Sequence, residues 1–185
     1  MVMDSSCFRK EILHFQNSLF RDVVDDCYLI TMEKSKRRKQ YLNQFDIYQP
    51  FHTINVIHNK GYKNCKKEAY ITTPTLDIID TYAKIFQECL RNDNTKRVLI
   101  FEDDFFFTET LETIQEYILD IQVFLEMNDF MIYNLGPLPY LMIPNTISLK
   151  HYMFKGGASH AVIYSKRAME CYVRDYKKIV NAADT

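Results

Sequence analysis

The chain reads Val98-Leu99-Ile100-Phe101-Glu102-Asp103-Asp104 near its middle, four apolar side chains followed directly by three carboxylates. A short apolar run of this kind predicts a buried strand. Apolar residues recur at offsets of three and four before it, at Leu76, Ile79, Ala83, Phe86 and Leu90, and after it, at Leu111, Ile114, Ile118, Ile121 and Leu125. A strand between two amphipathic helices, the first of them opened by Pro74, is typical of α/β proteins.

The remaining predicted elements extend this alternation in both directions. Before Pro74 we expect a peripheral helix over residues 4–22, a strand over 27–31, a helix over 33–45 and a strand over 51–57. Towards the C-terminus we expect strands over 130–135, 147–153 and 158–164, a Gly156-Gly157 turn, and a helix from residue 166. No linker or repeat divides the chain. The sequence therefore predicts one α/β domain over residues 1–185, with a central, mostly parallel sheet flanked by helices, a helical extension at residues 1–25 and a late β-hairpin insertion.

Charge and composition exclude several classes of protein. The chain carries 23 Lys and Arg against 24 Asp and Glu, a net charge of -1, which argues against a protein that coats nucleic acid. No apolar run approaches the roughly 20 residues of a bilayer span, and no secretory signal is expected. The five cysteines are widely spaced without a C-x-x-C pair, so neither a disulfide framework nor a zinc ribbon is expected. These features favour a reducing compartment, either the bacterial cytosol or, for a viral protein, the host cytoplasm.

The acidic run Glu102-Asp103-Asp104 is the first candidate site. In open α/β sheets, ligands bind beyond the carboxyl ends of the strands, which is where this run falls. Three adjacent carboxylates repel one another unless a cation compensates them. Oxygen ligands suit Mg²⁺ or Mn²⁺, particularly when a substrate diphosphate completes the coordination shell. The alternative is a solvated acidic turn at the start of the next helix, where negative charge is favoured.

Two further segments are candidates for the same site. The basic run over residues 34–39 opens a predicted helix, so it is suited to cradle a diphosphate, although such runs are often solvated faces. His160 follows the paired glycines Gly156 and Gly157, which permit close approach of a ligand to the backbone. The alternative for His160 is a histidine of the core behind a hairpin turn.

The apolar loop over residues 137–144 is either a wall of an acceptor site or a rigid loop packed on the late hairpin.

Taken in order, these segments resemble family 25 of the glycosyltransferases, the lipopolysaccharide and collagen glycosyltransferase type, which has the GT-A fold. The family opens with a strand, an Asn-Leu-Asp step and an arginine-rich helix start, similar to residues 28–39 here. Thr31 stands where the family has Asn, and Arg38 falls on its characteristic Arg. A later helix of the family carries a Ser-His pair and a Trp, where this chain has Thr81, Tyr82 and Phe86.

The second half of the resemblance begins at the acidic run. Residues 98–104 match the family's apolar strand ending in Glu-Asp-Asp, and residues 133–136 match a strand with a Leu-Gly end. Residues 157–161 resemble its Gly-Thr-His-Ala strand, and Ser165-Lys166-Arg167 its Ser-Arg step before a helix. The likeness covers residues 26–176, and five segments in the same order and spacing carry it.

The resemblance implies a GT-A-like, Rossmann-related fold and transfer of a sugar, with inversion, from a nucleotide-sugar to a hydroxyl of a glycan or protein acceptor. A UDP-sugar is the expected donor, and Mn²⁺ or Mg²⁺ the expected cofactor. The implied metal ligands are Glu102, Asp104 and His160. The implied nucleotide contacts are Thr31, Met32, Arg38, Thr81 and Asp103. The implied general base is Asp184, which lies one residue from the end of the chain, as in a catalytic domain of a longer protein.

Two other functions fit the same residues. A nucleotidyl or phosphoryl transferase would use the carboxylates in a two-metal site, which requires further acidic ligands from another strand. An inactive GT-A-like module would bind a partner or a carbohydrate, and Thr81-Tyr82 in place of the Ser-His pair favours it. The absence of G-x-S-x-G, P-loop and G-x-G-x-x-G motifs leaves hydrolase triads and dinucleotide-binding folds unsupported.

Overall fold

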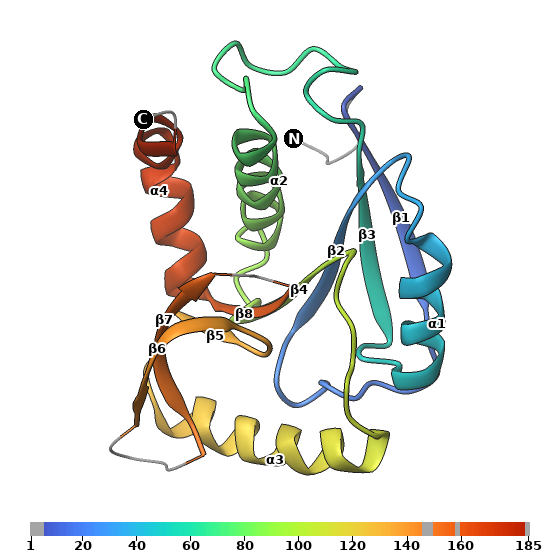
Figure 1. Ribbon diagram of the computed structural model, residues 1–185, viewed down its shortest axis with the longest axis vertical. Coiled ribbons are helices and arrows are strands. Elements are labelled where there is room, and N and C mark those ends of the chain that lie inside the picture. Colours follow the sequence, from blue (N-terminus) through green and yellow to red (C-terminus); the bar gives the residue numbers. More distant parts are fainter. Residues whose placement is uncertain (1–5, 146–149, 158–159, 184–185) are drawn as a thin grey trace.

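A computed structural model describes residues 6–145, 150–157 and 160–183 and shows an α/β fold with a mixed six-stranded sheet (Figure 1). The first half contains β1 (Phe8–His14), β2 (Asp26–Met32), α1 (Arg38–Tyr48), β3 (Thr53–Asn59), α2 (Pro74–Cys89) and β4 (Arg97–Glu102). The second half contains α3 (Leu111–Met127), β5 (Ile132–Asn134), β6 (Leu138–Pro144), β7 (Tyr152–Gly157), β8 (Ala161–Ser165) and α4 (Lys166–Ala183). The GT-A relation itself stays a prediction.

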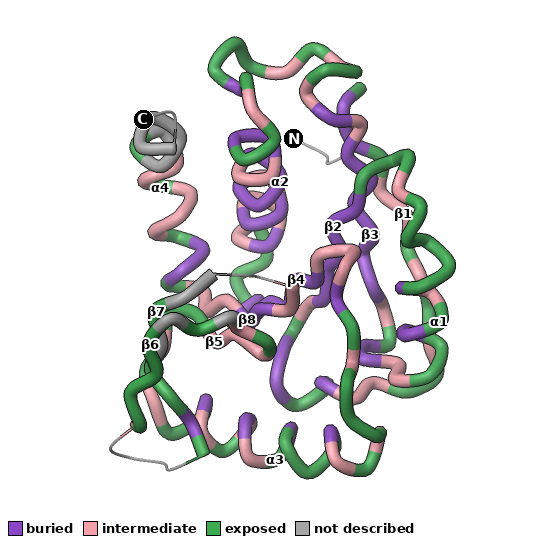
Figure 2. Tube along the Cα trace, viewed as in Figure 1, coloured by how far each residue is buried: buried purple, intermediate pink, exposed green. Residues whose placement is uncertain are grey.

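The sheet lies between two layers of helices because side chains alternate across its central strands. On β4, Leu99 and Phe101 pack in one core cluster with residues of α1 and α3, whereas Val98 and Ile100 pack in the other with residues of α2 and α4. Figure 2 shows the buried residues concentrated in β2, β3 and α2. The predicted helices at Pro74 and Leu111 are confirmed, and Thr73 and Thr110 cap them by accepting hydrogen bonds from backbone N–H groups.

The strand order β1-β3-β2-β4-β8-β5 corrects the expectation of a mostly parallel sheet. β2 runs parallel to both β3 and β4, but the pairs β1–β3, β4–β8 and β5–β8 are antiparallel. Parallel neighbours require a crossover, which α1 and α2 supply, whereas β8 follows the β6–β7 ribbon without a helix between them. The sheet therefore has a parallel centre and antiparallel edges.

The N-terminal segment is also a correction, because residues 8–14 form a strand and not a peripheral helix. β1 pairs along its whole length with β3, from Phe8 opposite Asn59 to His14 opposite Thr53. Phe8 and Ile12 are four residues apart, a spacing that fits one face of a helix and one face of a strand equally well. Pairing with an otherwise open strand edge decides between them.

The late hairpin differs from the expected one, which joined strands over residues 147–153 and 158–164. A separate two-stranded sheet is present, but it consists of β6 and β7, whereas β8 pairs with β4 and β5 in the main sheet. Residues 138–144, expected as a loop, form β6, and Gly156 and Gly157, expected in a turn, belong to β7, where Gly157 lies opposite Leu138. The ribbon lies outside the main sheet, between β5 and β8 in the chain.

A disulfide joins Cys7 to Cys65, although the spacing of the cysteines indicated no disulfide framework. The bond ties the start of β1 to the loop between β3 and α2, which are 58 residues apart in sequence. Spacing alone gives no sign of such a pair, because the fold brings the two segments together. Among the described residues, none of the helices has the length and apolar character needed to cross a bilayer.

A buried ion cluster holds the same loop on α2. Lys67 forms ion pairs with Asp77 and with Asp80, whose Oδ2 is 3.5 Å from Lys67 Nζ; the three side chains are only 4%, 6% and 4% exposed. Asn59 donates a hydrogen bond to Asp77 at 3.1 Å, and the Tyr176 hydroxyl donates one to Asp80 at 3.0 Å. Buried charges require such partners, so the loop is fixed by electrostatics as well as by the disulfide.

Candidate functional site

The candidate site lies where the order of the central strands reverses. The chain passes from β2 through α1 to β3 on one side of β2, and then through α2 to β4 on the other side. The two helices cover opposite faces of the sheet. The crevice between the carboxyl ends of β2 and β4 is therefore a topological switch point, the usual ligand site of open α/β sheets.

The three predicted metal ligands come together at this point. Oxygen atoms of Glu102 and Asp104 and a ring nitrogen of His160 all lie within 4.8 Å of one another. His160 Nδ1 is 2.7 Å from Asp104 Oδ1. The Glu102 N–H donates to the His160 carbonyl at 3.0 Å, which extends the β4–β8 pairing by one step and fixes the two residues side by side. Two carboxylates and an imidazole are a donor set that suits Mn²⁺ or Mg²⁺.

Neighbouring side chains orient the acidic residues. The buried Thr31, at the end of β2, donates to Asp103 Oδ2 at 2.7 Å, so these two predicted nucleotide contacts meet. The Tyr82 hydroxyl donates to Glu102 Oε1 at 2.9 Å from the opposite side of the sheet. Glu102 and Asp103 therefore each have a partner on a helix or strand, as a preorganised site requires.

Arg37 supplies positive charge to the cluster. Its Nη1 lies 3.0 Å from Asp103 and 3.9 Å from Asp104, and its side chain is 53% exposed. One guanidinium beside three carboxylates leaves negative charge in excess, which a divalent cation would balance. The exposed guanidinium is also placed to receive a phosphate, for which its planar fork is suited.

Arg38, which the resemblance indicated as the nucleotide contact, lies elsewhere. Its guanidinium binds both oxygens of Glu11 on β1, at 2.7 and 3.0 Å, and Glu11 also lies 2.7 Å from His58 Nε2. The Arg38 hydrogen bond lowers the pKa of Glu11 to about 2, and burial lowers the pKa of His58. Arg38 therefore joins α1 to the sheet edge, whereas its neighbour Arg37 lies beside the acidic run.

The Glu11 cluster predicts acid sensitivity. His58 resists protonation in the folded state, so stability should begin to fall below its ordinary pKa of 6.5. Glu11 must then be protonated, so stability should fall further between pH 4.5 and about 2. Glu11→Gln should cost about 1–2 kcal/mol at neutral pH and flatten the lower part of this profile. Urea unfolding at several pH values measures this, and a variant profile parallel to the wild-type one would contradict the assignment.

The other predicted nucleotide contacts are divided between two environments. Met32 is half-exposed and lines a cavity of about 460 Å³ at the ends of β2 and β3, together with Lys34, Lys60 and Asn64. Thr81 is 0% exposed and bonds to Asn59 and to the Asp77 carbonyl, so it has no surface to offer a ligand. Burial in the core thus explains why Thr81 does not line the site.

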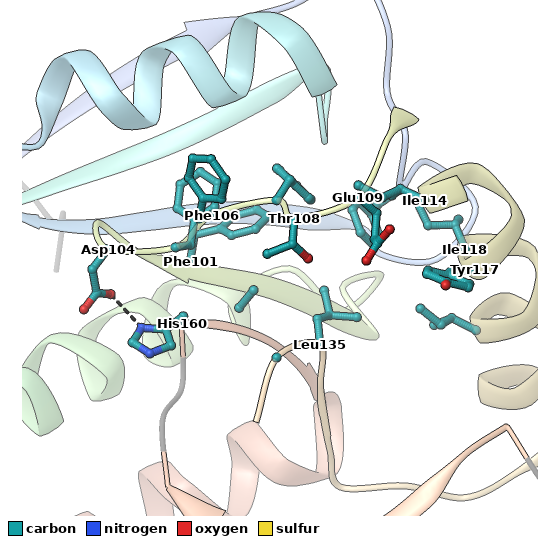
Figure 3. A pocket seen from close by; sticks show the side chains of 16 residues that line it. Phe101, Asp104, Phe106, Thr108, Glu109, Ile114, Tyr117, Ile118, Leu135 and His160 are labelled. Atoms are coloured by element: carbon teal, nitrogen blue, oxygen red, sulfur yellow. Dashed lines mark hydrogen bonds and ion pairs between the residues drawn. The ribbon is translucent and has the colours of Figure 1, made fainter. Parts of the chain in front are cut away.

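A larger cavity of about 520 Å³ opens beside Asp104 and His160. Figure 3 shows Asp104 and His160 at one end of it, Tyr117 and Ile118 of α3 at the other, and Leu135 between them. Aromatic side chains that follow or end β4 form much of its wall, including Phe101 and Phe106. This is the usual composition of a ligand site, an apolar cleft with polar groups at one end.

Sequence reasoning located the acidic cluster but missed Arg37 and Tyr82 as its partners. Arg37 lay within the predicted basic run, and Tyr82 was noted only as a departure from the resembled family. The predicted base, Asp184, lies outside the described residues. No protein-family model matches the chain, and no curated protein shows significant sequence similarity to it.

Proposed function

We propose that this protein is a metal-dependent glycosyltransferase that uses a nucleotide-sugar donor, with a UDP-sugar as the first candidate. The observation that carries the proposal is the meeting of Glu102, Asp104 and His160 at the switch point of the sheet. Nucleotides bind at this position in open α/β folds, and a cation bound by these three residues would neutralise the charge of a leaving diphosphate. The order of the sequence segments that resembles family 25 of the glycosyltransferases supports the same function.

The surrounding residues suit the parts of such a donor. The nucleoside would occupy the cavity lined by Met32, Lys60 and Asn64, and the diphosphate would lie between that cavity and the acidic cluster, within reach of Arg37. In the transfer, an acceptor oxygen bonds to the anomeric carbon from the face opposite the diphosphate, and the bond to the diphosphate oxygen breaks. The acceptor proton passes to a base, for which Asp184 stays a prediction.

Arg37 and Arg38 provide a matched test of the diphosphate site. Arg37→Ala should raise the KM for the nucleotide-sugar about tenfold or more, because it removes a charge-assisted contact to phosphate. Arg38→Ala should reduce thermal stability but leave the KM near the wild-type value. The measurement is nucleoside diphosphate released from UDP- and GDP-sugars in the presence of Mn²⁺. The opposite pattern, with the KM effect at Arg38, would restore the role that the resemblance implied.

A two-metal nucleotidyltransferase is less well supported. Such a site requires a second set of acidic ligands. Across residues 6–145, 150–157 and 160–183, the only grouping of three or more potential metal ligands is Glu102, Asp104 and His160.

The partners expected of a glycosyltransferase are a nucleotide-sugar and a glycan or protein acceptor. A cytoplasmic location stays a prediction, and the Cys7–Cys65 bond weighs against it, since disulfides persist in oxidising compartments.

A further inference from the structure

A second cavity of about 500 Å³ lies between α3, β5 and the start of β7. Its wall contains three tyrosines and four other polar residues: Tyr117, Asp120, Tyr133, Asn134, Lys150, His151 and Tyr152. Tyr117 and Tyr152 are 52% and 48% exposed, so their rings offer large apolar faces to a ligand. Many hydroxyls and ring faces in one cleft suit a ligand that is polar at its edges and apolar on its faces.

The wall of this cavity carries no net charge. Asp120 and Lys150 form an ion pair at 2.5 Å and so compensate each other. Burial lowers the pKa of His151, which stacks on Phe124 at 4.0 Å between ring centres, and so disfavours the charged form of its ring. Burial raises the pKa of Tyr133 to about 12, so its hydroxyl keeps its proton. Charged groups of opposite sign in equal number suit a neutral polyol, which uses both donors and acceptors, better than a phosphate or a free cation.

The second cavity continues the first. Tyr117, Ile121 and Leu135 line both, and Tyr117 lies at the end of the first cavity that is distant from Asp104 and His160 (Figure 3). A ligand that begins beside Asp104 and His160 and extends along α3 therefore reaches the tyrosines of the second cavity. A chain of linked rings has the required length and shape.

We propose that the second cavity binds a neutral pyranose ring of a glycan acceptor, at a distance from the sugar that is glycosylated. The hydrophobic C–H face of the ring stacks on Tyr117 or Tyr152, and its hydroxyls bond to Asp120 and Lys150. The inference rests on the proposed function where it calls the bound glycan an acceptor, but glycan binding itself requires neither nucleotide nor metal. Of the two acceptor classes that the proposed function leaves open, glycan and protein, this inference favours the glycan.

An array of neutral, sulfated and phosphorylated glycans, probed with the protein in the absence of nucleotide and Mn²⁺, tests the site. A neutral oligosaccharide should bind, and its Kd should then be measured by NMR titration. Tyr152→Ala and Tyr117→Ala should each weaken binding by about fivefold to tenfold, and Tyr152→Phe by less than about twofold. Tyr70→Ala, which alters a tyrosine outside both cavities, should leave the Kd unchanged. Both targeted rings are about half-exposed, and circular dichroism checks that the variants fold.

Three results would overturn the inference: no neutral glycan bound, binding restricted to anionic glycans, or a Kd that Tyr117→Ala and Tyr152→Ala leave unchanged. The test separates this site from the proposed function. Asp104→Ala should retain glycan binding in full, since Asp104 does not line the second cavity. Tyrosine-dependent glycan binding without turnover of any nucleotide-sugar would leave the site intact, and the protein would then be a carbohydrate-binding module.

Discussion

Asp104→Ala should lower the rate of Mn²⁺-dependent turnover of the nucleotide-sugar by roughly a hundredfold or more. Asp104 is the centre of the cluster, since it lies 2.7 Å from His160 and within reach of Arg37. Its removal takes away one of the three groups that would bind the cation and leaves His160 without its carboxylate partner. The measurement is the initial rate of nucleoside diphosphate release at saturating donor, with and without Mn²⁺.

The stability of the variant is the control for this loss of turnover. Removing one of three adjacent carboxylates relieves repulsion, so Asp104→Ala should change the free energy of unfolding by less than about 1 kcal/mol. Asp93→Ala, which removes a fully exposed carboxylate outside the site, should leave both rate and stability near the wild-type values. Turnover that persists in Asp104→Ala with the same dependence on Mn²⁺ would contradict the assignment of Asp104 as a metal ligand.

Lys67→Met should be the most destabilising of the substitutions considered, at about 3–5 kcal/mol. It leaves Asp77 and Asp80 buried without their cation, and neither carboxylate can reach water at 6% and 4% exposure. For a chain of 185 residues, this corresponds to a fall in Tm of about 6–20 °C. Calorimetry at neutral pH measures it directly.

A second change tests whether unpaired charge is the cause. Adding Asp77→Asn to Lys67→Met removes one of the two uncompensated carboxylates, so the double variant should recover part of the lost stability. Lys66→Met is the matched control, because Lys66 is the exposed neighbour of Lys67 and should tolerate the change. Equal Tm values for Lys67→Met and Lys66→Met would show that the cluster contributes little.

The elements that carry the site were predictable because their signals are local. The apolar run of β4 and its carboxylates are contiguous, and the helices that begin at Pro74 and Leu111 have strong periodicity and capping threonines. His160 was predictable as a candidate because the chain's paired glycines precede it. The second half of the fold, in which β8 returns antiparallel to β4, depends on the β6–β7 ribbon and has no local signal.

Other features depend on geometry that a sequence does not fix. Neighbouring residues on a helix point about 100° apart, so whether Arg37 or Arg38 faces the acidic run depends on where α1 begins. It begins at Arg38, five residues later than expected, which leaves Arg37 beside Asp103 and turns Arg38 towards Glu11. The Cys7–Cys65 bond and the β1–β3 pairing likewise join segments that are far apart in the chain.

The most direct test of the account is a crystal structure of the protein soaked with Mn²⁺ and UDP, in which the anomalous signal locates the metal. The account predicts a manganese peak within bonding distance of Glu102 or Asp104 and of His160, with UDP phosphate oxygens completing the shell and Arg37 beside them. A UDP molecule bound elsewhere, or manganese bound without any of these three side chains, would contradict it.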